Sequence, residues 1–192
     1  MANDEEEWDM YAPVLPATPS DGWTLDNLPS DLPKHTELIR GALVMSPQKG
    51  WHLLVVRMLE HGLFSQAPNT YLVLREMAVR KSPRSAPEPD VSLVRAAAFE
   101  LDKSIYLPED IALAIEVVSP ESEERDREDK PVMYAMMGIP GFWLVERGED
   151  DAPVVYEHRL AGDRFKLVNT HVGRLVTDTP FPIDIPLHVP ER

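Results

Sequence analysis

The sequence contains no cysteine, which excludes disulfide bonds and metal sites built from thiolates. It also lacks any apolar run approaching the roughly 18 residues that cross a bilayer, so no membrane-spanning helix is expected. The first ten residues, MANDEEEWDM, are acidic, whereas a signal peptide begins basic and continues apolar. These absences fit a reducing compartment, and we expect a cytoplasmic location.

Basic residues are scarce as well: 19 Lys and Arg face 33 Asp and Glu, a formal net charge of −14. The imbalance argues against a protein that coats nucleic acid, because phosphate binding relies on Lys and Arg. Residues 1–31 hold eight acids and no base, which leaves 25 acids and 19 bases, a net −6, for the rest. Residues 75–84 (REMAVRKSPR) carry four bases and one acid. This distribution suits an enzyme whose metal ions meet the phosphate.

With 192 residues, 43% of them hydrophobic, the chain is long enough for one domain with a sizeable core. Residues 1–20 combine acidic side chains with three prolines, and we expect a flexible acidic tail there. In this tail Trp8 and Tyr11 are either solvated or dock onto a partner or the protein's own body. Residues 21–192 are then a single domain, which opens with a short helix or turn at 21–33.

Hydrophobic spacing predicts the order of the elements. Alternating residues predict a β-hairpin over 36–45, and apolar residues three and four apart predict a helix over 49–64. An unbroken apolar run at 111–118 is typical of a central strand, and a second helix is expected at about 128–138. Further strands are predicted at 71–79, 90–94, 141–146, 154–159 and 164–168, with a proline-blunted edge segment at 180–187. The order predicts an α/β fold whose central mixed sheet is flanked by helices.

Glu116 lies inside the strongest strand signal, ALAIEVV. Alternation places Leu113, Ile115 and Val117 on one face of this strand and Glu116 on the other. If both faces are covered, an unpaired carboxylate costs several kcal/mol or takes up a proton. A metal ion, an arginine or a lysine would remove that cost. The alternatives are a Glu116 that points into solvent from a one-sided sheet, and an ordinary ion pair.

Asp90 and Lys130 extend the argument from Glu116. Asp90 begins a second short apolar run, and on its own it would indicate a turn. Two strand carboxylates together offer the oxygen ligands that Mg²⁺ or Mn²⁺ prefers. Lys130, near the start of the second predicted helix, could orient an attacking water or stabilise charge on a phosphate. Its alternative role is that of a surface lysine paired with Asp126 at the i,i+4 spacing.

Several of these segments also occur together in a known family. They are TELIRGALVMSP, Pro89-Asp90-Val91, IEVVSPES, Asp126 with Lys130 and Tyr134, and GIPGFWLVE. In this order and spacing, from about residue 36 to 158, the chain resembles the Uma2 family of restriction-endonuclease-like proteins. That family lies within the PD-(D/E)xK nuclease superfamily. The resemblance implies a restriction-endonuclease-like core with a central mixed sheet.

The resemblance also implies roles for individual residues. Asp90 and Glu116 would bind Mg²⁺ or Mn²⁺, and Val117 could add its backbone carbonyl. The superfamily usually has a lysine two residues after the glutamate, where this chain has Val118. The resemblance implies that Lys130, on the following helix, takes the place of that lysine.

Glu37 matches a glutamate that many superfamily members bring in from an N-terminal element, so the implied catalytic set includes it. His52 stands where the family often has a histidine, with no assigned chemistry. The implied function is a divalent-metal-dependent endonuclease that hydrolyses phosphodiester bonds of nucleic acid, with DNA as the expected substrate. A homodimer would suit double-strand cleavage, and the loop at 80–84 is expected to contact phosphate.

Two alternatives stay open at this point. One is a catalytically inactive module that keeps the nuclease fold and engages a protein partner, for which the low positive charge argues. The other is an enzyme that uses the same residues to hydrolyse a small phosphoester. Fold alone does not decide between them.

Overall fold

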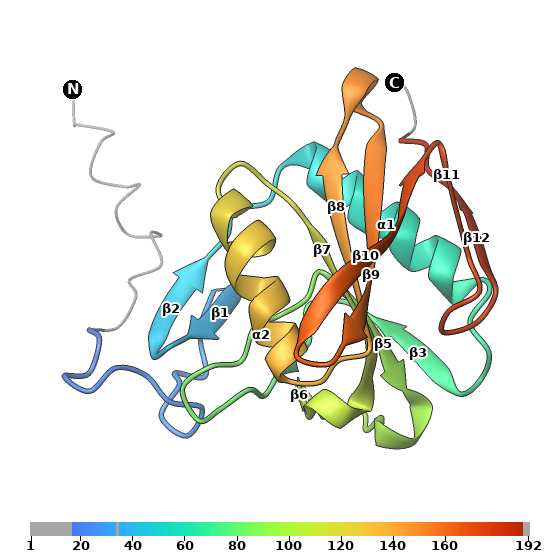
Figure 1. The fold of residues 1–192 in the computed structure, drawn as a ribbon. Coiled ribbons are helices and arrows are strands. Elements are labelled where there is room, and N and C mark those ends of the chain that lie inside the picture. The colour runs from blue at the N-terminus through green and yellow to red at the C-terminus, as the bar shows by residue number, and fades with distance from the viewer. Residues whose placement is uncertain (1–16, 34, 190–192) are drawn as a thin grey trace, which may run out of the picture.

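The computed structural model describes residues 17–33 and 35–189, and every structural statement below concerns these residues (Figure 1). Six strands form the central sheet: β3 (Tyr71–Leu74), β5 (Val91–Arg95), β7 (Ile111–Val117), β8 (Gly141–Arg147), β9 (Pro153–Ala161) and β10 (Arg164–Val172). Their order is β10-β9-β8-β7-β5-β3. The β7–β8 pair is parallel and the other neighbouring pairs are antiparallel. The predicted mixed sheet is therefore confirmed, with β7 in its interior.

Two helices cover opposite faces of this sheet (Figure 1). Helix α1 (Gly50–Phe64) presents buried Val56, Leu59 and Leu63, at spacings of three and four, to the face that carries the odd-numbered residues of β7 from Leu113 to Val117. Helix α2 (Lys130–Met136) follows a π-helical turn, η4 (Arg125–Asp129), and packs Tyr134 onto the other face. Both faces of β7 are thus buried, as a continuous apolar run predicts.

Smaller sheets surround this core. The predicted hairpin at 36–45 is confirmed as β1 (Thr36–Ile39) and β2 (Ala42–Met45). Its two-residue turn, Arg40-Gly41, has positive φ at both positions, 51° and 84°, which is the geometry that fits the twist of a hairpin. The remaining elements are β4 (Ala78–Val79), β6 (Ile105–Tyr106), β11 (Arg174–Thr177), β12 (Ile183–Pro186) and the short 3₁₀ turns η2 (Ala96–Ala98), η3 (Pro108–Asp110) and η5 (Glu149–Asp151).

Three predictions about elements need correction. The strand expected at 71–79 breaks into β3 and β4, because Glu76 between them has φ 54° and cannot continue a strand. The second helix begins with η4 and ends at Met136. Of the helix or turn expected at 21–33, the structure has turns, so that prediction stands. The segment at 180–187 does not lie at an edge of the central sheet, since β12 pairs with β11 in a separate hairpin that covers the α1 face.

Residues 1–16 lie outside the described residues, and with them most of the predicted acidic tail, including Trp8 and Tyr11. Within the described part of the chain, no helix has both the length and the apolar character needed to cross a bilayer.

Candidate active site

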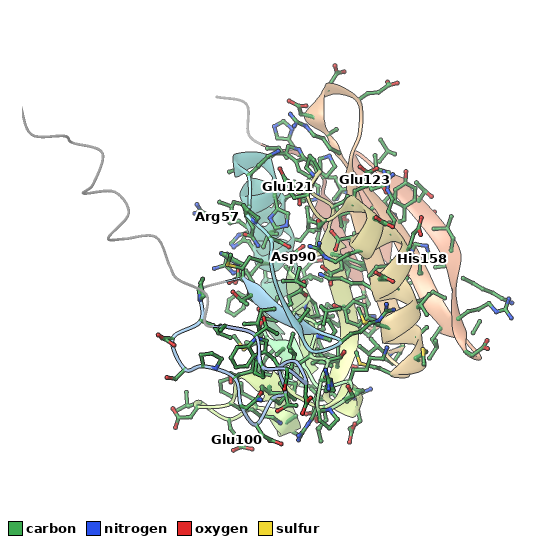
Figure 2. All side chains as sticks on the ribbon, turned by 90° about the vertical axis from the view of Figure 1, so that its left-hand side faces the viewer. Arg57, Asp90, Glu100, Glu121, Glu123 and His158 are labelled. Atoms are coloured by element: carbon green, nitrogen blue, oxygen red, sulfur yellow. The ribbon has the colours of Figure 1, made fainter. Side chains whose placement is uncertain are left out.

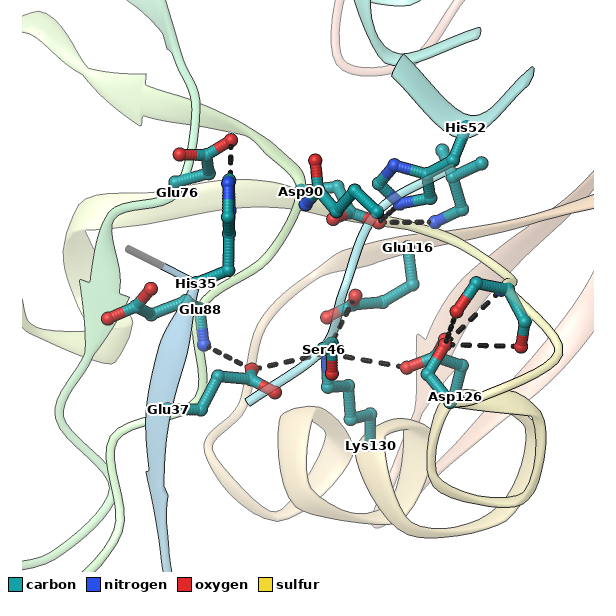
Figure 3. Close-up of a pocket in the computed structure, with 14 residues that line it drawn as sticks. His35, Glu37, Ser46, His52, Glu76, Glu88, Asp90, Glu116, Asp126 and Lys130 are labelled. Atoms are coloured by element: carbon teal, nitrogen blue, oxygen red, sulfur yellow. Dashed lines mark hydrogen bonds and ion pairs between the residues drawn. The ribbon is translucent and has the colours of Figure 1, made fainter. Parts of the chain in front are cut away.

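A polar pocket lies where the beginning of β5 meets the end of β7, between the β1–β2 hairpin and the start of α2 (Figure 3). Its empty space, counted together with the open solvent at its mouth, is about 430 Å³. Figure 2 shows Asp90 near the middle of this face of the molecule and Glu100 at its lower end. The titratable side chains that line the pocket are Glu37, Glu76, Glu88, Asp90, Glu116, Asp126, Lys130, His35 and His52. Among the described residues, six carboxyl groups therefore share the pocket with one lysine.

Glu116 reaches the pocket from β7 and is only 1% exposed. Its neighbours Ile115 and Val117 pack on the α1 face, and Tyr134 of α2 covers the opposite face. The alternative of a solvent-facing Glu116 is therefore wrong. Lys130 Nζ lies 2.9 Å from Glu116 Oε2, and the Tyr134 hydroxyl donates to Glu116 Oε1. Both oxygens of the carboxylate are thus engaged, one by a cation and the other by a hydroxyl.

Asp90 directly precedes β5, whose first residue, Val91, pairs with Ile115 of β7. This register places Asp90 level with the end of β7. The backbone N–H of Val117 donates to Asp90 Oδ2 at 2.7 Å, and His52 Nε2 of α1 lies 3.1 Å from the same oxygen. Burial lowers the pKa of His52, but its hydrogen bond with Asp90 and the charge of that carboxylate outweigh burial and raise the pKa. His52 is therefore suited to donate to Asp90 and hold it in place.

Lys130 enters the pocket because the segment before it, η4, winds back across the end of β7. Its Nζ lies 3.1 Å from Glu37 Oε1 and 3.4 Å from Asp126 Oδ1, in addition to its contact with Glu116. Asp126 also accepts a hydrogen bond from the Ser122 hydroxyl. The i,i+4 pair with Asp126 does form, but neither residue is at the surface: Lys130 is 5% and Asp126 is 2% exposed.

Glu37 comes from β1 and is 4% exposed. Its Oε1 accepts a hydrogen bond from the backbone N–H of Glu88 at 2.7 Å, which fixes the chain two residues before Asp90. Burial, together with the charges of Glu37 and Glu76, raises the pKa of the Glu88 carboxyl to about 8. Glu37 thus links the loop that carries Asp90 to the ammonium of Lys130.

We use the term carboxylate cluster for the four acids nearest Lys130: Glu37, Asp90, Glu116 and Asp126. Burial raises the pKa of Glu116 well above its ordinary value; Lys130 opposes that rise, and the other acids of the cluster add to it. Burial lowers the pKa of Lys130, but the cluster, with Glu116 first, raises it well above its ordinary value. Lys130 is therefore a permanent cation, and its single charge does not neutralise the cluster.

The donor chemistry of the pocket fits a hard divalent cation. Mg²⁺ is usually bound by one or two carboxylates and completes its shell with water and substrate phosphate. Asp90 and Glu116 supply two carboxylates. The carbonyl of Val117 faces the same side, because its N–H donates to Asp90 and both groups of a strand residue point one way. Among the described residues no three His, Asp or Glu side chains form a metal-holding group by themselves. An ion here would take further oxygens from water and substrate.

The loop at 80–84 does not line the pocket, and its contact with phosphate stays a prediction. Its backbone is used to tie neighbouring segments together: Gly41 N–H donates to Arg84 O at 2.7 Å, and Leu25 N–H donates to Pro83 O at 2.8 Å. The loop is close to Asp90 in sequence, but it supports the hairpin turn at the far end of β1.

Asp126, Tyr134 and Ser122 belong to the site, although sequence reasoning gave them no part in its chemistry. Helical spacing could have identified the first two, because Asp126 lies four residues before Lys130 and Tyr134 four residues after it. Asp126, Lys130 and Tyr134 then lie on one face of the helix. Ser122 had no comparable signal, since its hydroxyl contacts Asp126 only through the winding of η4.

A family model matches most of the chain. The model of the Uma2 family, described as "Putative restriction endonuclease", matches residues 24–185. The chain belongs to the Uma2 family. The family match extends beyond both ends of the segment, 36–158, over which the resemblance was noted. No curated protein matches the sequence.

A solved structure shows the same fold. It is a crystal structure of a "putative nuclease belonging to DUF820" from Anabaena variabilis, superposed with a TM-score of 0.61 at 19% sequence identity. The match covers 82% of this chain and 89% of the other. At this identity the likeness concerns the fold, and it confirms the restriction-endonuclease-like core of this Uma2 protein.

Proposed function

We propose that this Uma2 protein is a divalent-metal-dependent nuclease that hydrolyses phosphodiester bonds of nucleic acid. The observation that carries the proposal is the convergence of Asp90, Glu116 and Lys130 in one pocket, from three different elements. Two carboxylates can hold the cation that assists phosphodiester hydrolysis, and a fixed ammonium can stabilise the developing charge. Membership of a family described as restriction endonucleases supports the same reaction class.

Asp90 and Glu116 would hold the cation, with the Val117 carbonyl as a third oxygen. When bound, the cation supplies a water of lowered pKa and draws charge from a phosphate oxygen. The two acids are held in different ways. Val117 N–H and His52 fix Asp90 Oδ2, which leaves Oδ1 for a ligand, whereas Tyr134 fixes Glu116 Oε1. These contacts keep both side chains in one rotamer, which reduces the ordering needed when a ligand binds.

Lys130 would act by its charge. Its pKa is raised well above the ordinary value, so Lys130 stays protonated and does not act as a general base. A fixed ammonium beside Glu116 can instead hydrogen-bond an attacking water and offset the negative charge that develops on the phosphate oxygens. Glu37, on the other side of the ammonium at 3.1 Å, would hold Lys130 in position and could bind a further water.

We also propose which ion and which substrate bind. Oxygen ligands favour Mg²⁺ or Mn²⁺ over softer metals. DNA is the proposed nucleic acid, and a homodimer would let two such pockets act on opposite strands.

Thermal unfolding with and without millimolar Mn²⁺ tests the metal site before any substrate is chosen. Metal at about ten times its Kd stabilises the native state by roughly 1.4 kcal/mol, which raises the midpoint by about 3–6 °C for a chain of this length. We expect this rise in the native chain and in Glu100→Ala, which removes an exposed acid at the far end of this face (Figure 2). Glu116→Gln, which keeps the shape of the side chain, should abolish it. An equal rise in Glu116→Gln would contradict the site.

Cleavage assays then separate the reaction classes. The native chain with Mn²⁺ should cut plasmid DNA or a labelled oligonucleotide, and Glu116→Gln should not. A protein that binds Mn²⁺ and cleaves neither nucleic acid nor a small phosphodiester would match the inactive binding module. Turnover of a small phosphodiester with intact plasmid would match the second alternative.

A further inference from the structure

Arg125 lies at the rim of the pocket, in the first position of η4. Its Nη2 donates a hydrogen bond to the Ser46 hydroxyl at 2.6 Å, and Ser46 lines the pocket. The bond joins η4 to the end of β2 across 79 positions of sequence. The guanidinium is therefore held in a defined place next to the opening, five residues before Lys130.

Arg125 has no anionic partner among the described residues. Among the described residues no carboxylate lies within 4.0 Å of its guanidinium, and its buried Nε has no hydrogen-bond acceptor. No hydrogen bond to a described residue uses Nη1 either.

Three cations on neighbouring segments are paired with acids. Lys49 Nζ lies 2.6 Å from Glu121, and Arg40 lies 3.7 Å from Asp129. Arg127, two residues after Arg125, contacts Glu146 at 2.6 Å and also Glu123. Arg125 thus lies among similar acidic side chains, but no described carboxylate pairs with it.

A half-buried guanidinium without an anion is costly, and its geometry matches a phosphate, which can accept two parallel N–H bonds. We propose that Arg125 binds a backbone phosphate of the nucleic acid that enters the pocket, next to the phosphate that is cleaved. The assignment rests on the proposed nuclease function. Ser46 and the burial of Nε would fix the guanidinium so that Nη1 and the second proton of Nη2 face the strand.

The acidic side chains of the pocket explain why a bound nucleic acid would need the contact with Arg125. The acidic side chains of the pocket repel a free anion, so a nucleic acid needs a positive group outside the carboxylate cluster. The charge of Lys130 is shared among Glu37, Glu116 and Asp126, whereas that of Arg125 is available. A phosphate contact of this kind strengthens binding without reading the base sequence.

The test compares Arg125→Gln with Arg127→Gln, both in the full chain. Glutamine removes the charge and keeps a polar amide of smaller reach, and Arg127 provides a matched loss of one positive charge on the same turn. Binding of a fluorescein-labelled 20-mer duplex in Ca²⁺ is measured by anisotropy between 50 and 200 mM salt. We expect Arg125→Gln to weaken binding about tenfold, equally for different sequences, and to reduce the slope of log Kd against log salt by about one. Arg127→Gln should change neither.

Two results would overturn the assignment. The first is equal affinity of Arg125→Gln and Arg127→Gln for the duplex. The second is weaker binding of Arg125→Gln with an unchanged slope of log Kd against log salt, which would indicate a structural role through Ser46. The Mn²⁺-induced rise in midpoint provides an independent check, because it should be the same in Arg125→Gln and in the native chain. Failure of the native chain to bind any oligonucleotide or to cleave would remove the proposed function itself. A native chain that binds and cleaves, with Arg125→Gln unaffected, would remove only the role of Arg125.

Discussion

Lys130 and Glu116 form a buried ion pair at 2.9 Å although 14 residues separate them in sequence. The strand supplies an acid that has no access to water, and the following helix supplies the cation. One turn further on, Tyr134 donates to the other oxygen of the same acid. A strand and a helix that pack together to form the core are therefore also what assembles the site.

Replacing Lys130 with methionine should lower activity and yet strengthen metal binding. The change removes the one lysine that lines the pocket among the described residues, so the carboxylate cluster attracts Mn²⁺ more strongly. We expect cleavage to fall by about 10²–10³-fold, as for loss of one preorganised electrostatic group. The free energy of unfolding without metal should fall by about 3–5 kcal/mol, since one side of a buried pair is lost. Mn²⁺ should then raise the midpoint by more than it does in the native chain.

Lys166→Met is the control for this change, because Lys166 lies exposed on β10, away from the pocket. It should alter neither cleavage nor the response to Mn²⁺. Full cleavage by Lys130→Met would show that the reaction does not need the ammonium.

Tyr134→Phe and Tyr106→Phe should have opposite effects on stability. Both tyrosines are fully buried, but the Tyr134 hydroxyl donates to Glu116, whereas the Tyr106 hydroxyl has no partner among the described residues. Loss of the first should lower the free energy of unfolding by about 1–3 kcal/mol, because a buried carboxylate oxygen loses its donor. Loss of the second removes an unsatisfied polar group and should be neutral or stabilising.

Urea denaturation of the two variants measures this difference. Tyr134→Phe should also reduce the Mn²⁺-induced rise in midpoint, since Glu116 is then less firmly oriented. Equal destabilisation by the two changes would mean that the Tyr134 hydroxyl contributes nothing specific to Glu116.

Much of the fold could be predicted from hydrophobic spacing. The hairpin at 36–45, the first helix and the central strand at 111–118 each carry a strong periodic pattern, and the structure has them within a residue or two. The same pattern left a buried and a solvent-facing Glu116 as alternatives, and the structure has the buried one. Lys130 was predicted either at the site or at the surface, and it lies beside Glu116.

Other features depend on contacts that local sequence does not contain. Glu76 adopts φ 54° and ends a strand that its apolar neighbours would have continued. The β11–β12 hairpin is separate from the sheet because Leu175, Ile183 and Ile185 pack onto the α1 face. Asp126 looked like the surface partner of a surface lysine, and only the packing of η4 against β7 buries both. In each case tertiary contact overrides a local preference.

Gly62 should be intolerant of alanine even though it lies inside a helix. A Cβ there would come within 2.8 Å of two carbons of Ile185, a residue that is itself buried. Overpacking costs about 1–3 kcal/mol, which exceeds the gain of about 1 kcal/mol in helix propensity. Gly50→Ala is the control, since nothing lies within 4 Å of its Cβ position in the same helix. Urea denaturation should show a loss for Gly62→Ala and no loss for Gly50→Ala.

Glu157 should make stability depend on pH on the acid side. It is 3% exposed on β9, with His171 Nε2 at 3.0 Å, and it accepts hydrogen bonds from Thr177 Oγ1 at 2.9 Å and Arg159 Nη2 at 3.1 Å. Burial raises the pKa of Glu157, but these bonds outweigh burial and lower the pKa below its ordinary value of 4.5. The carboxylate therefore stabilises the fold fully above pH 4.5, and this contribution is lost as the pH falls through the lowered pKa.

Glu157→Gln should accordingly lower the free energy of unfolding at pH 7, by about 1.5–3 kcal/mol for hydrogen bonds to a charged group. The gap between the native chain and the variant should narrow as the pH falls below 4.5, because the native carboxylate then takes up a proton and resembles the amide. Glu149→Gln, an exposed acid on η5, controls for the loss of one negative charge. A gap that stays constant down to the acid transition would mean that Glu157 contributes by its shape, and that its charge does not stabilise the junction between β9 and β11.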